Sequence, residues 1–372
     1  MSEAPEPSSA DTRLPFRRLP AAGRWAILLV ASLALGGALQ WAGLPGALML
    51  GPLGAGILVQ MGGGTVQVPG FLMAVAQAVI GCLVAGSITP AIVHGFVLHW
   101  PVFLGAVALV VAASAAIGWT MSRLRIIRGS TAVWGMLPGA SIVMMLMAKE
   151  YGADYRLVAF MQYLRVVLVA AAASVVALMF VHGDGADGGG RFAAGLFPPV
   201  DPVNLAATAA VALAGGALGR VTRMPAGVLL GPLVLGAVLN VLGWVRIELP
   251  PVVMVASFAF IGWSVGLRFT RDVLATAARA LPQSVGATVL LMAFCGAVAW
   301  LLVVLLHVDP LTAYLATSPG GVDAAVVIAA STKVDMPFVM ALQMVRLIIL
   351  LAIGPSVARW VAGTLDGARC AR

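Results

Sequence analysis

Charged residues are scarce in this sequence. They make up 10% of its 372 residues, whereas soluble globular proteins carry about 25%. Hydrophobic residues account for 61%, and the mean hydropathy is +1.04. Apolar segments of about 17 to 25 residues, long enough to cross a bilayer as helices, follow one another with few polar interruptions. The composition therefore excludes a soluble globule and predicts a polytopic membrane protein.

Cysteine and histidine are also scarce, with three and four residues. Cys82 and Cys295 lie inside apolar segments and Cys370 lies in the C-terminal tail, so no disulfide framework or CxxC motif is available. The histidines lie at segment ends and lack the spacing of a metal site. We therefore expect no metal, no cofactor and no enzymatic activity.

The net charge of +8 comes from arginines that stand singly or in groups of two or three beside apolar segments. This distribution is typical of membrane-topology charge, and it does not form a patch that could bind nucleic acid. We therefore expect no nucleic-acid partner.

The most informative feature is a stretch, Ser318 to Arg346, that has a copy in the first half of the chain at a constant offset. Each copy has a Pro-Gly pair in apolar sequence, then an Asp, then Gln and Arg three residues apart. The matched residues are Pro138-Gly139 and Pro319-Gly320, Asp154 and Asp335, Gln162 and Gln343, and Arg165 and Arg346. Because proline removes a backbone donor and glycine tolerates unusual dihedral angles, each copy predicts an interrupted helix. The interruptions fall within Ser130–Met147 and Leu311–Thr332. Each is followed by an apolar helix with Gln and Arg on one face.

Other segments repeat as well. Leu44–Gly56 is echoed by Met224–Gly236 at an offset that differs by one position, with a shared Leu-Gly-Pro. This pair is either a kinked, closely packed helix or a lining of the solute path. The other expected helices are Trp25–Leu39, Gly70–Ile88, Val102–Met121 and Leu157–Phe180, matched by Leu205–Gly219, Val252–Phe269, Pro282–Leu302 and Pro337–Val361. We divide the chain into a disordered N-terminal segment (1–23), a first repeat (24–181), a Gly- and Asp-rich linker (182–202), a second repeat (203–362) and a tail (363–372).

The distribution of Lys and Arg predicts the topology. If both termini are cytoplasmic and each repeat crosses five times, with its Pro-Gly element re-entrant or broken, 17 Lys and Arg face inward and three face outward. An odd number of crossings inverts the second repeat relative to the first. The Arg268–Arg279 loop then corresponds to a nearly charge-free loop, Pro90–Trp100. The predicted fold is an all-α polytopic membrane protein with two inverted repeats.

Arg165 and Arg346 are expected within the membrane, where each charge costs at least ~2.5 kcal/mol without a partner. One interpretation is structural, with each arginine bound to helix-end carbonyls or to a nearby acid. The other is that the two arginines flank a site for a carboxylate or other oxyanion. Asp154 and Asp335 begin the same helices and are either N-caps or ligands.

Asp323 is the best candidate for carrying a coupling proton or sodium ion, because it follows the second break in an apolar run and its counterpart is Ile142. Hydroxyl groups at the breaks come from Ser141, Thr317 and Ser318. The full set of candidate substrate-binding residues is Pro138, Gly139, Ser141, Gln162, Arg165, Ser318, Pro319, Gly320, Gly321, Gln343 and Arg346.

The Leu-Pro-Gly-Ala of Leu137–Ala140 with Gln162 to Arg165, and the Ser-Pro-Gly-Gly of Ser318–Gly321 with Gln343 to Arg346, resemble the bacterial AbrB family of duplicated inner-membrane proteins. The resemblance covers roughly Ala22 to Ala362. It implies an inverted-repeat fold similar to the cation/anion antiporter class. Members of this family have been labelled regulators and ammonia monooxygenases. The first copy lacks the second copy's acid, so the two halves need not act alike.

The sequence thus favours a secondary transporter-like protein of the bacterial inner membrane that moves a small solute, an organic anion such as a carboxylate, with H⁺ or Na⁺. The alternative is a membrane-embedded sensor or regulator of gene expression, although no expected extramembrane stretch exceeds about 25 residues. An oxidoreductase of the ammonia monooxygenase type fits less well, because it needs a His- and carboxylate-rich metal site. The lipid bilayer is a partner, and a homodimer stays open.

Overall fold

The computed structural model describes residues 19–64, 66–88, 90–127, 130–138, 141–181, 201–222, 227–271, 278–320, 322–332, 334–347 and 349–350, with the single positions 353 and 356. Within these ranges every regular secondary-structure element is a helix, which confirms the all-α prediction. Asp323 and Ser141 lie in described helices, but their side chains lie outside what is described, as do Gly139 and Gly321 entirely.

The first half of the chain forms α1 (Ala21–Trp41), α2 (Ala47–Met61), α3 (Gly70–Ser87), α4 (Pro90–Arg123), α5 (Thr131–Met136), α6 (Ser141–Glu150) and α7 (Tyr155–Val181). The second half forms α9 (Pro202–Val221), α10 (Gly227–Val241), α11 (Pro251–Gly266), the 3-10 helix η2 (Ala278–Ala280), α13 (Leu281–Leu306), α14 (Pro310–Thr317) and α15 (Val322–Ala330), followed by the helix Met336–Leu347. The order of elements in the second half repeats that in the first.

One expected loop is wrong. The stretch Pro90–Trp100 is helical, because α4 begins at Pro90 and runs for 34 residues with Pro101 inside it. Proline suits the first turn of a helix, where its missing N–H is not needed, and the residues that follow are apolar. The part of α4 that is long and apolar enough to cross a membrane is Trp100–Arg123.

Six described helices are long and apolar enough to cross a membrane: α1, α3, Trp100–Arg123 of α4, Tyr155–Met179 of α7, α9 and α13. Four shorter apolar helices are α2, α10, α11 and Met336–Leu347. Each of them overlaps one of the segments at which the sequence predicts a crossing, and the last predicted segment, Pro337–Val361, is described as a continuous helix only as far as Leu347. These helices are compatible with a membrane protein.

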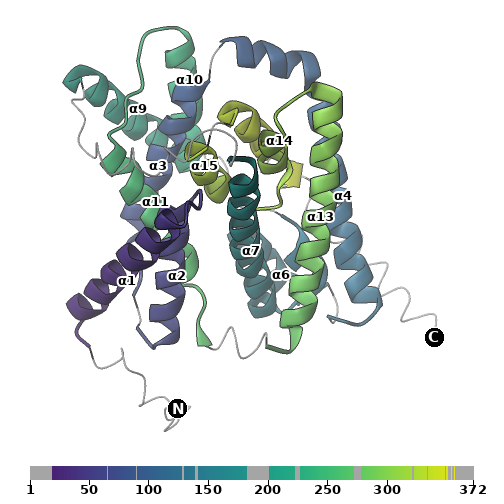
Figure 1. Ribbon diagram of the computed structural model, residues 1–372. Helices are drawn as coiled ribbons and strands as arrows, with labels where there is room; N and C mark the ends of the chain where they lie inside the picture. The colour runs from purple at the N-terminus through teal and green to yellow at the C-terminus, as the bar shows by residue number, and fades with distance from the viewer. Residues whose placement is uncertain are drawn as a thin grey trace.

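The helices gather into two groups (Figure 1). We call α1, α2, α3, α9, α10 and α11 the first bundle, and α4 to α7 with α13 to α15 the second bundle. Each bundle draws helices from both halves of the chain, so the halves interleave in space. The broken elements α5/α6 and α14/α15 both lie in the second bundle, where α7 contacts each of them.

Glycines let helices of the two halves touch backbone to backbone in the first bundle. A β-carbon on Gly81 of α3 would lie 2.4 Å from the carbonyl oxygen of Leu229 in α10. A β-carbon on Gly262 of α11 would lie 2.5 Å from the carbonyl oxygen of Met49 in α2. The two contacts are equivalent under the sequence repeat. They support the close-packing interpretation of the two Leu-Gly-Pro helices.

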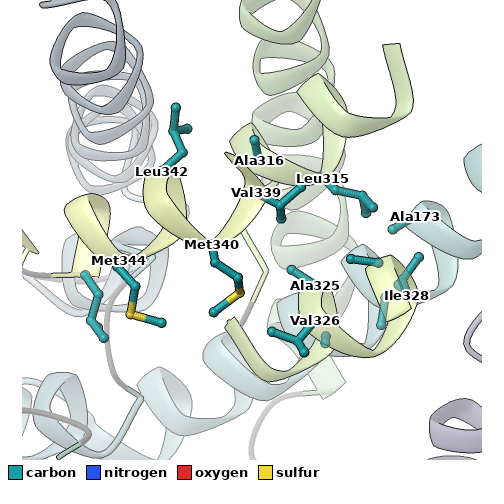
Figure 2. Close-up of a cluster of buried hydrophobic side chains, with 14 of the residues drawn as sticks. Ala173, Leu315, Ala316, Ala325, Val326, Ile328, Val339, Met340, Leu342 and Met344 are labelled. Carbon is teal, nitrogen blue, oxygen red and sulfur yellow. The ribbon is translucent and has the colours of Figure 1, made fainter. Parts of the chain in front are cut away.

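The core of the second bundle is built from small and flexible apolar side chains. Figure 2 shows Ala325, Val326 and Ile328 of α15, and Ala316 of α14 beside Val339 of the helix Met336–Leu347; all belong to one buried apolar cluster. Because alanine and valine are short, the broken elements pack close to the helices that carry Gln and Arg. The core therefore places polar side chains within reach of the helix breaks.

We expect Gly81→Ala to destabilise the protein by about 1 to 3 kcal/mol, because the new methyl group has no room beside the Leu229 carbonyl. The midpoint of thermal unfolding of the purified protein in detergent measures the effect. Gly37→Ala is the matched control, since a β-carbon on Gly37 has nothing within 4 Å. A Gly81→Ala protein as stable as this control would contradict the close-contact argument.

Candidate functional site

Both predicted helix breaks are present. In the first, α5 ends at Met136, and Leu137 has the extended dihedral angles φ −65° and ψ 120° before Pro138. In the second, α14 ends at Thr317, and Ser318 has φ −54° and ψ 136° before Pro319. Proline forces the preceding residue out of the helical region, which is why each helix stops where it does. The prediction of two interrupted helices is confirmed.

A broken helix leaves the carbonyl groups of its last turn without partners. At the first break, Gln162 of α7 supplies them. Its Nε2 donates to the carbonyl oxygens of Trp134 at 2.9 Å and Leu137 at 3.0 Å. Arg165 completes the arrangement, with Nη1 donating to Met136 O at 3.1 Å and Nη2 donating to Gln162 Oε1 at 2.6 Å. We call Gln162 and Arg165 with these carbonyls the first clasp.

The second clasp has the same plan. Nε2 of Gln343 donates to the carbonyl oxygens of Leu315 at 2.8 Å and Ser318 at 3.3 Å. Arg346 Nη2 donates to Gln343 Oε1. Leu315 and Ser318 are the repeat counterparts of Trp134 and Leu137, so the glutamine contacts match residue for residue across the repeat.

The two arginines differ in what they hold. Arg165 Nη1 reaches Met136 and, at 3.4 Å, Gly135, which both lie within α5. Arg346 instead donates to Ser318 O at 2.5 Å and Gly320 O at 2.8 Å, so it fastens the backbone of the break itself. A positive side chain at a helix C-terminus also interacts favourably with the helix dipole. Both clasps thus contain the contacts that the structural interpretation predicts, in which each arginine binds carbonyl groups at a helix end.

The clasps are buried and positively charged. Arg165 and Arg346 are 2% and 3% exposed, and both glutamines are fully buried. Among the described side chains neither arginine pairs with a carboxylate. Both clasps lie in the second bundle, where α7, which carries Gln162 and Arg165, contacts the broken elements of both halves. The Nε–H of Arg165 is buried and has no acceptor among the described atoms.

Asp154 and Asp335 are helix caps, as one of the two interpretations had it. Asp154 Oδ1 accepts from the N–H groups of Arg156 at 3.0 Å and Leu157 at 3.2 Å. Asp335 Oδ1 accepts from Phe338 N–H at 3.0 Å. These carboxylates lie about two helical turns before the clasp glutamines along the chain, and they hold the starts of the helices that carry the clasps.

Two threonines that sequence reasoning missed tie each cap to its broken helix. Thr131 Oγ1 accepts from Asp154 N–H at 3.2 Å, and Thr312 Oγ1 accepts from Asp335 N–H at 3.1 Å. The two threonines occupy equivalent positions in the repeat, so the repeat offset could have found them. Each broken helix is therefore pinned at its start by a threonine and at its end by a clasp.

The other predicted residues near the breaks are partly described. Pro138, Pro319 and Gly320 are buried at the breaks. Ser318 Oγ donates to Leu315 O at 3.0 Å, and Thr317 Oγ1 donates to Cys295 O at 3.1 Å, so both hydroxyls contact backbone. Asp323 is the second residue of α15 and lies three residues beyond Gly320; its role stays a prediction.

Sequence reasoning also missed the contacts between the bundles. Gly46 precedes α2 and has a φ of 77°. Its N–H donates to the Oγ of Ser331, the residue that follows α15, at 3.0 Å. Arg268 Nη1 donates to Tyr163 Oη at 3.1 Å, next to the Gln162 of the first clasp. No sequence signal pairs these residues, because the repeat relates positions in equivalent elements and these contacts join different ones.

Comparison with known proteins places the chain in a family. A family model described as "Transition state regulatory protein AbrB" matches residues 48–362, which include both clasps. The chain belongs to the AbrB family. It is 41% identical over 339 residues to a protein of Escherichia coli (strain K12) named "Putative regulator AbrB", covering 91% of this chain and 97% of that relative. No solved structure matches the chain. The family that the sequence resembles is thereby confirmed.

In this AbrB-family chain we expect Arg346→Lys to lower the free energy of unfolding by about 1.5 to 3 kcal/mol. A lysine ammonium cannot reach Ser318 O, Gly320 O and Gln343 Oε1 in the planar geometry that the guanidinium provides. Thermal unfolding in detergent is the measurement. The control is Arg246→Lys, since Arg246 is exposed. Equal stability of the two variants would show that the second clasp does not hold the break.

Proposed function

We propose that this protein is a secondary transporter of the bacterial inner membrane that moves a small organic anion with a proton or sodium gradient. The observation that carries the proposal is the pair of clasped helix breaks in one bundle, each with a buried arginine that has no carboxylate partner among the described side chains. Irregular backbone at membrane depth is tolerated where it is buried in protein or lines a wet cavity, and transporters use such breaks to contact solutes.

The inverted-repeat architecture belongs to this proposal. It is supported by the equivalence of contacts in the two halves: Gln162 and Gln343 hold matching carbonyls, and Gly81 and Gly262 meet matching backbone atoms. The charge distribution supports the inversion, because five crossings per half keep most Lys and Arg on one side. The described apolar helices, long and short, support this topology because each overlaps one of the ten predicted crossings.

The preference for an anion follows from the charge of the clasps. Two buried guanidinium groups without an acid among the described side chains attract an oxyanion, and the dipoles of the carbonyls that they hold compensate only part of the charge. The Nε–H of Arg165 is a buried donor that no described atom accepts. A hydrogen bond from this group to a bound carboxylate would favour binding of that ligand. In this proposal the carboxylate binds beside Arg165, while Arg346 keeps the second break in shape. Asp323 carries the coupling ion.

A sensor or regulator is the second candidate, and the printed descriptions of the family and of its Escherichia coli member favour it. A sensor of this design would bind the same anion at the clasps without releasing it on the far side. Binding alone is therefore common to both candidates. Flux separates them.

For topology, we expect both chain termini to be cytoplasmic, with ten crossings and the linker outside. In a protein lacking Cys82 and Cys295, native Cys370 of the tail should react with an impermeant thiol reagent only from the cytoplasmic side. A cysteine placed at Ala186 of the linker, in a background that also lacks Cys370, should react only from the periplasmic side. Reaction of the Ala186→Cys protein from the cytoplasmic side alone would contradict five crossings per half.

For activity, we expect the purified protein in liposomes to accumulate a labelled small carboxylate when a proton or sodium gradient is imposed. A panel of mono-, di- and tricarboxylates covers the solute class. Binding of a carboxylate without flux in either gradient would favour the sensor. Arg346→Lys should weaken the binding indirectly, because the second break loses the planar guanidinium that keeps it in shape.

For coupling, we expect Asp323→Asn to abolish gradient-driven uptake while the yield of folded protein stays unchanged, since asparagine cannot exchange a proton or neutralise a cation. Asp201→Asn is the matched control, because Asp201 caps α9 at the surface and asparagine caps helices equally well. If Asp323→Asn fails to fold, and removal of Arg346 as well restores the yield, Asp323 is a structural partner of Arg346 and coupling through it is refuted.

A further inference from the structure

The first bundle contains an apolar pocket of about 500 Å³ that has no part in the clasps. It lies between α3, α9 and the start of α11, with Val79 and Cys82 on one side and Ala212 and Gly216 on the other. Its volume is within the ~300 to 1,000 Å³ of pockets that hold small molecules. In Figure 1, α9 lies beside α3 and α10 at the edge of the molecule.

The equivalent place in the other half of the bundle is filled. Trp263 is the repeat counterpart of Cys82, is 5% exposed, and packs edge-on against Trp25 and Phe260 with ring centroids 5.8 and 5.5 Å away. Its Nε1 donates to Ser32 Oγ at 2.8 Å. The pocket exists because the matching positions hold smaller side chains: Cys82 for Trp263, Val79 for Phe260 and Ala212 for Ser32.

The pocket also differs from its equivalent in charge. Arg220 lines its edge near the end of α9 and is exposed, whereas the matching position in α1 holds Gln40. The flanks of the pocket belong to α3 and α9, two helices long and apolar enough to cross a membrane. Leu213 and Phe71, which line it, are 76% and 68% exposed. An apolar cavity thus opens on an outer face and has a cation at its edge.

We propose that this pocket binds an acyl chain of an anionic phospholipid, with the lipid phosphate against Arg220. The proposal rests on the membrane placement in the proposed function, and not on transport. Exposed apolar faces of membrane-crossing helices meet lipid chains, and basic groups beside crevices between such helices bind lipid head groups. In the proposed topology the Arg220 end of α9 is cytoplasmic, where a phosphate head group of the inner leaflet would lie. The tryptophan cluster replaces the lipid chain in the other half.

Two kinds of variant test the acyl-chain part. Cys82→Trp with Ala212→Ser copies the filled arrangement of Trp263 and Ser32 into the pocket. Gly216→Leu fills it by another route, because a β-carbon on Gly216 has nothing within 4 Å. Val289→Trp is the control, since it adds an indole to a half-exposed position of α13 away from the pocket.

Native mass spectrometry of protein released from membranes in mild detergent, with lipid extraction, is the measurement. We expect wild type and Val289→Trp to retain about one phosphatidylglycerol or other anionic phospholipid, and each pocket-filling variant to lose it at least tenfold in occupancy. Retention of the lipid by a folded pocket-filling variant would overturn the proposal. The proposal would also be overturned if the pocket-filling variants lost a bound molecule that is not a lipid. It would be overturned as well if filling the pocket displaced a second copy of the chain.

The charge part is tested with Arg220→Gln, which places the residue of the equivalent position in α1, and Arg246→Gln as an exposed control. In nanodiscs that mix phosphatidylglycerol and phosphatidylcholine, we expect wild type and Arg246→Gln to prefer phosphatidylglycerol and Arg220→Gln to lose about fivefold of that preference. An unchanged preference would overturn the assignment of the phosphate to Arg220. Lipid occupancy is read without any solute gradient, so a protein without flux can still bind the lipid, and loss of the lipid with flux retained leaves the proposed function intact.

Discussion

The side-chain hydrogen bonds of the two clasps are the interaction on which the second bundle depends. A helix that stops inside an apolar environment leaves carbonyl groups that water cannot satisfy, and each such group costs free energy comparable to a lost hydrogen bond. Gln162 and Gln343 satisfy two carbonyls each, and the arginines bind both the carbonyls and the glutamine side chains. Glutamine has the two amide hydrogens that this geometry uses and a carbonyl that receives the guanidinium. The breaks persist because these four side chains replace the missing turn.

The two bundles use close backbone packing and buried polar groups to different extents. In the first bundle, glycines bring helices into backbone contact, so dispersion and shape decide the packing. In the second, short apolar side chains bring the broken helices close, and buried polar groups then fix their ends. A substitution that adds one methyl group is disruptive at these glycines and also at Gly118 of α4 in the second bundle, where a β-carbon would lie 2.8 Å from the Cα of Val133. A substitution that keeps volume but removes a donor is felt most in the second.

The two copies of the repeat match closely in the contacts of their glutamines. They differ in the contacts of their arginines and in the side chains at the Cys82 and Trp263 positions. Arg346 fastens the backbone of its break, whereas Arg165 holds the preceding turn and keeps one donor that no described atom accepts. Trp263 fills a space that Cys82 leaves open.

The sequence by itself determined the helical class, the positions of the two breaks, and the pairing of Gln and Arg that follows each of them. These are local properties: proline and glycine act on their own backbone, and a spacing of three residues places side chains on one helix face. Because the offset between the two copies is constant, each feature found in one half predicted the same feature at the matching position of the other half. The start of α4 was predicted too late, because the apolar residues after Pro90 carry no helix signal distinct from a loop.

Only the tertiary structure decided what the polar residues touch. Gln162 binds carbonyls 25 and 28 residues away along the chain, and nothing local specifies that distance because it depends on how α7 packs against α5. The interleaving of the two halves, the contact of Gly46 with Ser331 and the pocket beside Cys82 have the same origin. Each arises where elements distant in sequence meet, and the side-chain volumes at the meeting point decide whether a space is filled or left open.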